Sequence, residues 1–308
     1  MDNSILAENI SKSYNGLQAL NNVSLEVKKG ELFGLIGPDG AGKTSLFRIL
    51  ATLLFADRGK AMVESFDVVK DYKKIRKIVG YMPGRFSLYF DLSVEENLKF
   101  YARIFNTTIQ ENYHLVKDIY QQIETFKKRL AGRLSGGMKQ KLALSCALIH
   151  SPEVLFLDEP TTGVDAVSRK EFWDMLKNLQ KEGITILVST PYMDEAALCD
   201  RVALMQKGNI LSIDRPEEIV NSYKPELASI QSSNMFDIIV DLQEFEDTAS
   251  VFRFGDSVHY TSESGAIEKE KIESFLKSRE HDHIRIEKIE PSIEDCFMEL
   301  MKQETNEA

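Results

Sequence analysis

Apolar residues follow two alternating patterns along the first two thirds of the chain. Short, continuous apolar runs predict buried strands at residues 31–37, 79–82, 154–158, 184–189 and 201–205. Between these runs, apolar residues recur every three or four positions, which predicts amphipathic helices at residues 44–54, 95–105 and 168–183. Strands that alternate with helices predict an α/β fold, with a mostly parallel sheet and helices on its faces.

Two regions depart from this alternation. Residues 93–150 have helical periodicity almost throughout, which predicts a helical subdomain inserted into the α/β core. After residue 223 the pattern gives a strand, a hairpin with its turn at Gly255 and Asp256, a helix, a strand and a helix. We therefore expect two domains, residues 1–223, with a helical subdomain at about 84–150, and an α+β domain at residues 224–308.

Composition narrows the possible partners and the compartment. The net charge of −10 over 308 residues disfavours a nucleic-acid-binding surface. Three widely separated cysteines, without metal-ligand spacing, are typical of reduced thiols in a cytosolic protein. The first residues, MDNSILAENI, do not resemble a signal peptide, and no apolar run reaches the about 18 residues of a membrane helix. If the protein acts at a membrane, we expect another chain to supply the span.

A glycine-rich loop joins the first of these predicted strands to the first of these predicted helices. Its sequence, GPDGAGKT at residues 37–44, matches G-x-x-x-x-G-K-[ST], in which glycines let backbone N–H groups surround a phosphate. Lys43 would supply a positive charge, and Thr44 a hydroxyl for Mg²⁺. The predicted nucleotide-binding residues are Gly37, Gly40, Ala41, Gly42, Lys43, Thr44 and Ser45.

Two acidic residues end the predicted strand at residues 154–158, in the sequence VLFLDEP. Asp158 is placed to hold Mg²⁺ through a water molecule, and Glu159 to act as general base on an attacking water. An acidic pair after a strand is usually only part of a turn. Behind a phosphate-binding loop, however, the functional interpretation is favoured.

A second anion-binding segment is predicted at LSGGMKQKLALSCAL, residues 134–148. Ser135, Gly136 and Gly137 open a helix with free backbone donors. In isolation such a segment would be an ordinary helix cap and turn. A chain that binds one nucleotide has no evident need of two anion sites.

The phosphate loop, LSGGM, VLFLDEP and TTGVDAVSR, in this order and spacing, resemble the nucleotide-binding domain of an ABC transporter over roughly residues 4–222. The resemblance implies a P-loop NTPase core with an antiparallel β subdomain and an inserted helical subdomain, with ATP and Mg²⁺ as ligands. It also implies a head-to-tail dimer, in which Ser135, Gly136 and Gly137 would contact the partner's ATP.

Two more residues match the family by position. Tyr14 matches the aromatic residue that stacks on adenine, although it could also be a core tyrosine of an edge strand. Asp165 matches the acidic residue that contacts the opposite subunit. It could equally be the N-cap of the helix that follows, and both roles are compatible.

Two positions depart from the family pattern. Gly84 stands where the family has a glutamine that contacts Mg²⁺ and the attacking water, and Pro191 stands where it has a histidine that contacts the γ-phosphate. Neither residue can make the contact, and proline lacks even a backbone N–H. The change could be neutral drift. Because the other motifs are intact, we expect instead a site that binds MgATP and hydrolyses it slowly, while the LSGG segment completes a partner's site.

Three segments resemble ATPase subunits of ABC-2 type exporters of the drug or antibiotic efflux class. They are LSGGMKQKLALSCAL, MDEAALCDRVALMQKGNI and the C-terminal IEPSIEDCFMELM. The implied partners are a membrane permease and a second ABC ATPase, with a heterodimer favoured over a homodimer, at the cytoplasmic side of the membrane. The aromatic residues Phe86, Tyr89, Tyr101 and Phe105 either receive a permease helix or form the core of the helical subdomain.

Two other functions remain open. A non-hydrolysing, ATP-gated regulatory subunit would also carry glycine and proline at positions 84 and 191. A soluble ABC protein acting on ribosomes or DNA should show a second ABC domain or a long coiled-coil insertion, and the sequence shows neither.

Overall fold

The computed structural model describes residues 3–307, with side chains described for residues 3–303. Within this range the chain forms two compact units. The first comprises residues 3–216 and 300–307, and the second comprises Glu217–Glu299. The predicted domain boundary, at residues 223 and 224, stays a prediction about where independent folding units meet.

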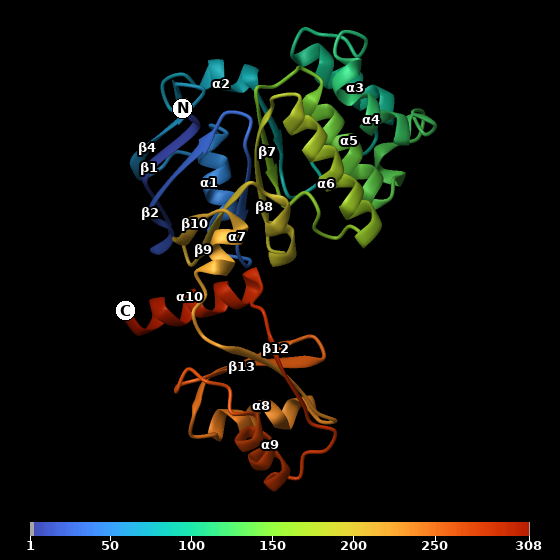
Figure 1. Ribbon diagram of the computed structural model, residues 1–308. Helices are drawn as coiled ribbons and strands as arrows, with labels where there is room; N and C mark the ends of the chain where they lie inside the picture. Colours follow the sequence, from blue (N-terminus) through green and yellow to red (C-terminus); the bar gives the residue numbers. More distant parts are fainter. Residues whose placement is uncertain (1–2, 308) are drawn as a thin grey trace. The chain divides into compact units, whose positions relative to one another are not determined.

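The first unit is built on a six-stranded sheet in the order β10-β9-β3-β8-β7-β6 (Figure 1). Five strands are parallel, and β10 pairs antiparallel with β9 at one edge. The predicted α/β core is therefore confirmed. Every residue of the interior strands β3, β7 and β8 is buried, in line with their mainly apolar sequences. The strands are β3 (Leu32–Ile36), β6 (Val79–Met82), β7 (Val154–Asp158), β8 (Thr185–Thr190), β9 (Arg201–Gln206) and β10 (Asn209–Asp214).

A second, antiparallel sheet lies in the same unit in the order β2-β1-β4-β5. Helix α1 (Lys43–Leu50) contributes Phe47, which packs edge-on against Phe156 of β7 with the ring centroids 6.0 Å apart. One apolar core thus joins residues of both sheets with the helix that follows the glycine-rich loop. The strands of the second sheet are β1 (Asn3–Tyr14), β2 (Leu17–Lys28), β4 (Arg58–Val63) and β5 (Phe66–Asp67).

The helical subdomain occupies the sequence between β6 and β7. A capping box starts its first helix: Ser93 Oγ accepts from the backbone N–H of Glu96, and the Glu96 carboxylate accepts from the backbone N–H of Ser93. Its helices are α3 (Val94–Ile104), α4 (Tyr113–Glu124), the short 3₁₀ helix η1 (Ala131–Arg133) and α5 (Gly136–Leu148). Outside it lie α2 (Tyr72–Ile78), α6 (Ala166–Lys181) and the 3₁₀ helix η2 (Met193–Leu198).

The second unit contains a four-stranded antiparallel sheet in the order β12-β13-β11-β14. Its elements follow a β-α-β-β-α-β sequence, the ferredoxin-like arrangement. The predicted hairpin is confirmed, because Phe254 pairs with Ser257 across a two-residue turn at Gly255 and Asp256. Its elements are β11 (Leu227–Gln231), α8 (Met235–Glu244), β12 (Thr248–Phe254), β13 (Ser257–Ser262), α9 (Lys269–Ser278) and β14 (Arg285–Ile289).

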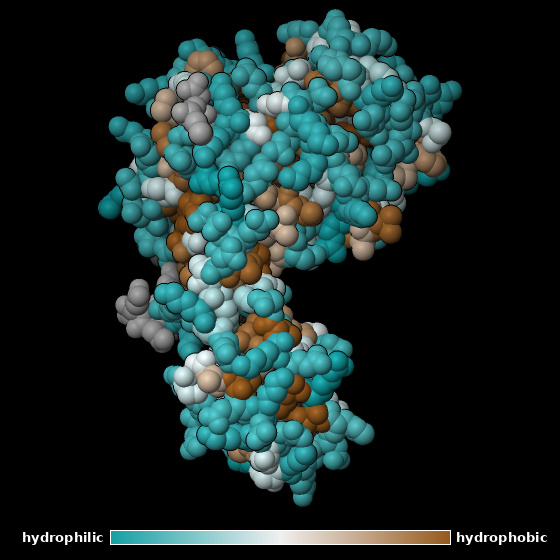
Figure 2. All heavy atoms as spheres, in the orientation of Figure 1, coloured by the Kyte–Doolittle hydropathy of each residue, from teal (hydrophilic) through white to brown (hydrophobic). Residues whose placement is uncertain are grey.

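Two helices continue across the division between the units, α7 (Pro216–Asn221) and α10 (Ile293–Glu307). Ser292 caps α10, since its Oγ accepts from the backbone N–H of Asp295 at 3.3 Å, and the Asp295 carboxylate accepts from the backbone N–H of Ser292 at 2.8 Å. The face of the molecule in Figure 2 is mainly hydrophilic, with hydrophobic residues in small patches. Among the described residues, no helix combines the length and the apolar character required to cross a bilayer.

Candidate functional site

The glycine-rich loop connects β3 to α1 at the carboxyl end of the parallel sheet. Gly42, its last glycine, precedes the helix with φ 105°, a backbone conformation that glycine adopts without a steric penalty. A Cβ at this position would lie 2.3 Å from the Ala19 carbonyl oxygen. Only glycine therefore allows the loop to lie this close to β2 while presenting its backbone to a phosphate.

Lys43 is buried inside this loop. Its ammonium group donates to the carbonyl oxygens of Gly37 at 2.7 Å and Pro38 at 2.9 Å, and it lies 3.3 Å from Glu159 Oε1. Only 3% of its side chain is exposed, so the charge is compensated by the Glu159 carboxylate and by two carbonyl dipoles. A phosphate held by Lys43 would compete directly with Glu159 for this charge.

Asp158 and Thr44 meet beneath the loop. Thr44 Oγ1 donates to Asp158 Oδ1 at 3.1 Å, and Ser189 Oγ donates to the same oxygen at 2.8 Å. The predicted Mg²⁺ ligands are thus within hydrogen-bond distance of each other. Among the described residues, no group of three or more His, Cys, Asp or Glu could hold a metal. This fits a Mg²⁺ site that takes one hydroxyl and one carboxylate from the protein, with waters and phosphate oxygens completing the shell.

Glu159 is held in an unusual backbone conformation, with φ 50°. Its backbone N–H donates to Ser189 Oγ at 3.0 Å and to the Ser189 carbonyl oxygen at 3.1 Å, which fixes the turn after β7. Left-handed backbone at a residue other than glycine is concentrated at functional sites. Ser189, which joins Asp158 to Glu159, was missed by the sequence analysis. The available signal was its place at the end of an apolar strand.

Tyr14 lies beside the loop at the end of β1. Its hydroxyl oxygen is 3.3 Å from Ser45 Oγ, and 41% of the residue is exposed. This exposure argues against a core tyrosine, and Lys12 Nζ lies 5.7 Å from the centroid of the ring. The role in adenine binding stays a prediction.

Ser135 and Asp165 both cap helices. Ser135 Oγ accepts from the backbone N–H of Met138 at 3.4 Å, and Asp165 Oδ1 accepts from that of Ser168 at 3.0 Å. The backbone hydrogen bond from Ser168 is the main cause that lowers the pKa of Asp165. Ser135, Gly136 and Asp165 are all exposed, so a second subunit could reach them.

Gly84 and Pro191 both border this site. The backbone of Gly84 lies against Asp158, since a Cβ on Gly84 would stand 3.0 Å from the Asp158 carbonyl oxygen. Pro191 follows Thr190, whose carbonyl oxygen accepts from the backbone N–H of Gly37 at 3.3 Å. Neither position supplies a polar side chain to the nucleotide site.

The family model described as "ABC transporter" matches residues 20–162. "Nod factor export ATP-binding protein I" of Burkholderia lata is 36% identical over 217 residues, which cover 70% of this chain and 71% of that protein. The chain belongs to the ATP-binding proteins of ABC transporters. The resemblance inferred from the sequence motifs is therefore confirmed.

Two further proteins are similar to this ABC ATP-binding chain. "Probable multidrug ABC transporter ATP-binding protein YbhF" of Escherichia coli is 36% identical over 217 residues, 70% of this chain. The chain spans only 38% of the length of YbhF. The structure of cbiO1 from Clostridium perfringens, described as part of the ABC transporter complex cbiONQ, superposes with a TM-score of 0.64 at 28% identity and covers 72% of this chain and 92% of that one.

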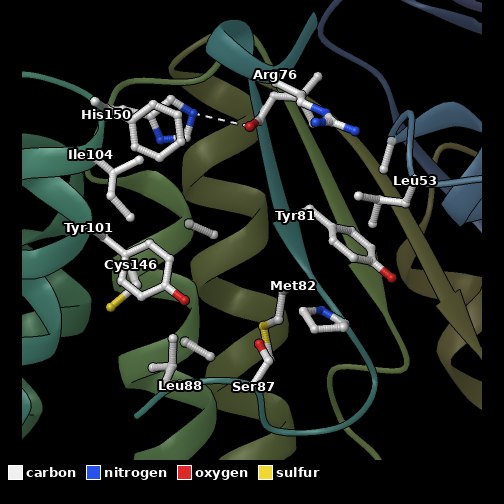
Figure 3. Close-up of a pocket in the computed structure, with 16 residues that line it drawn as sticks. Leu53, Arg76, Tyr81, Met82, Ser87, Leu88, Tyr101, Ile104, Cys146 and His150 are labelled. Atoms are coloured by element: carbon white, nitrogen blue, oxygen red, sulfur yellow. Dashed lines mark hydrogen bonds between the residues drawn. The ribbon is translucent and has the colours of Figure 1, made fainter. Parts of the chain in front are cut away.

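This ABC chain also has a cavity of about 400 Å³ between β6, α3 and α5 (Figure 3). Tyr101 and Phe105 line it, together with Met82, Leu88 and Ile104. Of the other two aromatic residues singled out in the sequence, Tyr89 is half exposed and Phe86 packs edge-on against Phe90, with centroids 5.2 Å apart. None of the four lies in the fully buried core.

His150 closes one side of this cavity (Figure 3). Its ring stacks on Phe105 with centroids 3.8 Å apart, and its Nε2 lies 3.1 Å from the Val79 carbonyl oxygen. Burial lowers the pKa of His150 to about 4, so the ring is neutral at physiological pH. The cavity is therefore lined on this side by an uncharged ring, while Arg76 also contributes to its lining.

Proposed function

We propose that this chain is the ATP-binding subunit of an ABC-2 type exporter of the drug or antibiotic efflux class. The observation that carries the proposal is the convergence of Lys43, Thr44, Asp158 and Glu159 at the carboxyl ends of β3 and β7. The names of YbhF and of the Nod factor export protein support export as the process served. Transport itself requires a partner, and we infer a separate membrane permease that holds this chain at the cytoplasmic side.

Each residue of the nucleotide site has a role that its position supports. Lys43 and the loop backbone bind the β- and γ-phosphates, and Tyr14 stacks on the adenine. Thr44 and Asp158 would hold Mg²⁺, which would neutralise charge on the phosphate oxygens when bound. Glu159 then exchanges its pairing with Lys43 for a pairing with the attacking water. Ser189 orients both acidic residues by its bonds to Asp158 Oδ1 and to the Glu159 backbone.

Hydrolysis at this site is proposed to be slow. Gly84 borders Asp158 and Pro191 follows Thr190 beside the glycine-rich loop, and the family resemblance implies that the side chains missing there contact the metal and the γ-phosphate. Loss of one donor aimed at a transition state costs about 10²–10³ in rate. The exposed Ser135 and Gly136, with the partly buried Gly137, would instead complete the site of a second ATPase with intact glutamine and histidine, which makes a heterodimer the favoured assembly.

The cavity lined by Tyr101, Phe105 and Ile104 is proposed to receive a short apolar helix of the permease. Tyr89 and Phe90 are each 50% exposed beside Leu88, and Ile104 is 54% exposed at the cavity itself. Exposed aromatic residues at the edge of an apolar cavity are typical of protein-binding surfaces.

Two single substitutions test the proposal that the partner's ATP site hydrolyses quickly and this chain's own site slowly. In a complex with the permease and an intact partner ATPase, Ser135→Arg should strongly inhibit hydrolysis, because it blocks the partner's site. Glu159→Gln should matter little, since this chain's own site is already slow. The opposite ranking would show that this chain's pocket is the working site. If neither substitution has an effect, the chain is a regulatory subunit that does not take part in hydrolysis.

A further inference from the structure

The segment between β6 and α3 is attached at several points to the residues around the start of α5. The backbone N–H of Gly132 donates to the Phe90 carbonyl oxygen at 3.0 Å. The backbone N–H of Ala131 donates to the Leu92 carbonyl oxygen at 2.9 Å. On the side-chain level, Lys139 Nζ lies 5.7 Å from the Phe86 ring centroid and 5.5 Å from that of Phe90. One cation thus faces two aromatic rings that also pack against each other.

The same segment forms part of the cavity. Ser87 and Leu88, which line it, lie in the sequence between the two phenylalanines that hold Lys139. Asn97, which is fully buried on α3, fixes the backbone conformation of the segment between β6 and α3. Its side chain accepts from the Tyr89 backbone N–H at 3.1 Å and donates to the carbonyl oxygens of Tyr89, Leu92 and Ser93. These bonds hold the backbone at Tyr89, Leu92 and Ser93 against α3, directly after Ser87 and Leu88 and on both sides of Phe90.

Lys139 is in turn bonded to Ser135. Its backbone N–H donates to the Ser135 carbonyl oxygen at 2.9 Å, in the first turn of α5, and Ser135 Oγ accepts from the backbone N–H of Met138. A displacement of the Lys139 side chain would consequently act on the first turn of α5, where Ser135, Gly136 and Gly137 lie. Position 84, a glycine, offers no side chain for a parallel route to the nucleotide.

We propose that Lys139 is a positioning residue, which couples occupancy of the cavity to the orientation of Ser135, Gly136 and Gly137 through its contacts with Phe86 and Phe90. This inference rests on the proposed function, in which the cavity receives the permease and those three residues contact the partner's ATP. A cation over an aromatic face is attracted directionally, so the ammonium group follows the rings when they move. Docking of the permease thereby adjusts the site that the partner uses.

A tethered filler tests the coupling without permease or nucleotide. Ser87→Cys introduces an exposed thiol at the cavity, which N-phenylmaleimide converts into a bulky apolar adduct. The natural Cys146, Cys199 and Cys296 react slowly by comparison, since they are buried and burial raises the pKa of each thiol. The readout is hydrogen exchange at the Met138 and Lys139 amides, which hydrogen-bond to Ser135.

We expect the adduct to change exchange at these two amides by about three- to five-fold, the range that one cation–π contact covers. Lys139→Met should abolish the change, and Lys139→Arg should retain it. Lys141→Met is the matched control, because Lys141 lies on the same helix and pairs with Glu171 at 2.7 Å instead. Phe90→Leu, at a half-exposed position, removes one ring without threatening the fold and should reduce the change.

An unchanged response in Lys139→Met, or no response in the parent chain, overturns the inference. Either result would leave the proposed function intact, because the experiment involves neither the permease nor ATP. Conversely, a chain that binds no permease would contradict the proposed function while the tethered response could still be present. In the complete complex, Lys139→Met should reduce the permease-dependent stimulation of hydrolysis and leave the Kd for MgATP unchanged, with Lys139→Arg restoring the stimulation.

Discussion

Gly84 lies directly against Asp158, so close that a Cβ on residue 84 would stand 3.0 Å from the Asp158 carbonyl oxygen. This contact is shorter than ordinary van der Waals distance. The Asp158 side chain in turn accepts hydrogen bonds from Thr44 and Ser189. The position that lacks the family's glutamine is therefore packed against the residue that is placed to hold Mg²⁺.

Restoring both missing side chains should increase turnover. The double substitution Gly84→Gln, Pro191→His supplies an amide beside Asp158 and an imidazole at the γ-phosphate position. We expect hydrolysis by the purified chain to rise by about 10-fold or more, while the Kd for MgATP changes little, because these groups act on the transition state. Steady-state hydrolysis and calorimetric titration measure the two quantities separately.

Gly84→Ala, Pro191→His is the matched control for this experiment. The alanine Cβ requires the Asp158 carbonyl to move by a few tenths of an ångström, as glutamine does, but brings no amide. If the control gains as much activity as the glutamine variant, the amide is not responsible. A double variant that is no faster than the parent chain would mean that the changes at Gly84 and Pro191 are neutral drift.

Removing the charge of Lys43 should strongly weaken nucleotide binding. Lys43→Ala deletes the group that the loop holds for the phosphates, and it leaves Glu159 facing the incoming anion without its partner. A charge-assisted contact of this kind accounts for about 10- to 100-fold in affinity. Calorimetry with MgATP measures the effect, and Glu159→Gln should retain binding. Absence of binding by the parent chain at millimolar ATP would contradict the assignment of the site.

The strands and the phosphate-binding loop were predictable because each is a continuous stretch of sequence. β7 has the predicted bounds, residues 154–158, because its four positions before Asp158 are buried and apolar and form a continuous run in the sequence. The helix predicted at residues 44–54 instead ends at Leu50. Thr52 adopts φ 62°, and the Arg48 carbonyl oxygen accepts from the backbone N–H groups of Leu53 and Leu54. These features turn the chain after the helix. The apolar periodicity continues through this turn and cannot reveal it.

Other features depend on pairings that no local pattern contains. The antiparallel strands β1 and β2 were expected only from the family resemblance, and their register shifts at four places, which weakens the regular alternation of a strand. The contact of Lys43 with Glu159 and that of Asp158 with Ser189 each join different strands or loops of the sheet. The sequence shows which residues end a strand, whereas the order of the strands decides which ends meet.

A carboxylate at the apolar edge of the cavity should weaken docking of the permease. Ile104→Glu places a carboxylate at its exposed edge, so an apolar permease helix would have to desolvate it. We expect co-purification with the permease to fall by about 10-fold or more, while MgATP binding stays unchanged. Val69→Glu is the control, because Val69 is similarly exposed at 52% but does not line the cavity. Equal loss in both variants, or none in Ile104→Glu, would place the permease elsewhere.

The last prediction concerns Asp295, which joins the start of α10 to β13. Burial alone would raise the pKa of Asp295, but hydrogen bonds from His259 and Ser292 outweigh it and hold the pKa below its ordinary value. His259 Nδ1 lies 2.6 Å from Asp295 Oδ1, and its ring stacks on Phe254 with centroids 3.9 Å apart. Because the folded-state pKa is the lower one, the carboxylate stabilises the fold fully above the unfolded pKa of about 4, and this contribution is lost as pH falls through the folded-state pKa.

Asp295→Asn should therefore lower the free energy of unfolding by about 1–3 kcal/mol at pH 7. Urea unfolding at pH 7 and at pH 3.5 should show a smaller difference between parent and variant at the lower pH, whereas Asp256→Asn, in the exposed hairpin turn, should have little effect at either. A difference that stays constant or grows towards low pH would mean that the charge of Asp295 does not stabilise this unit.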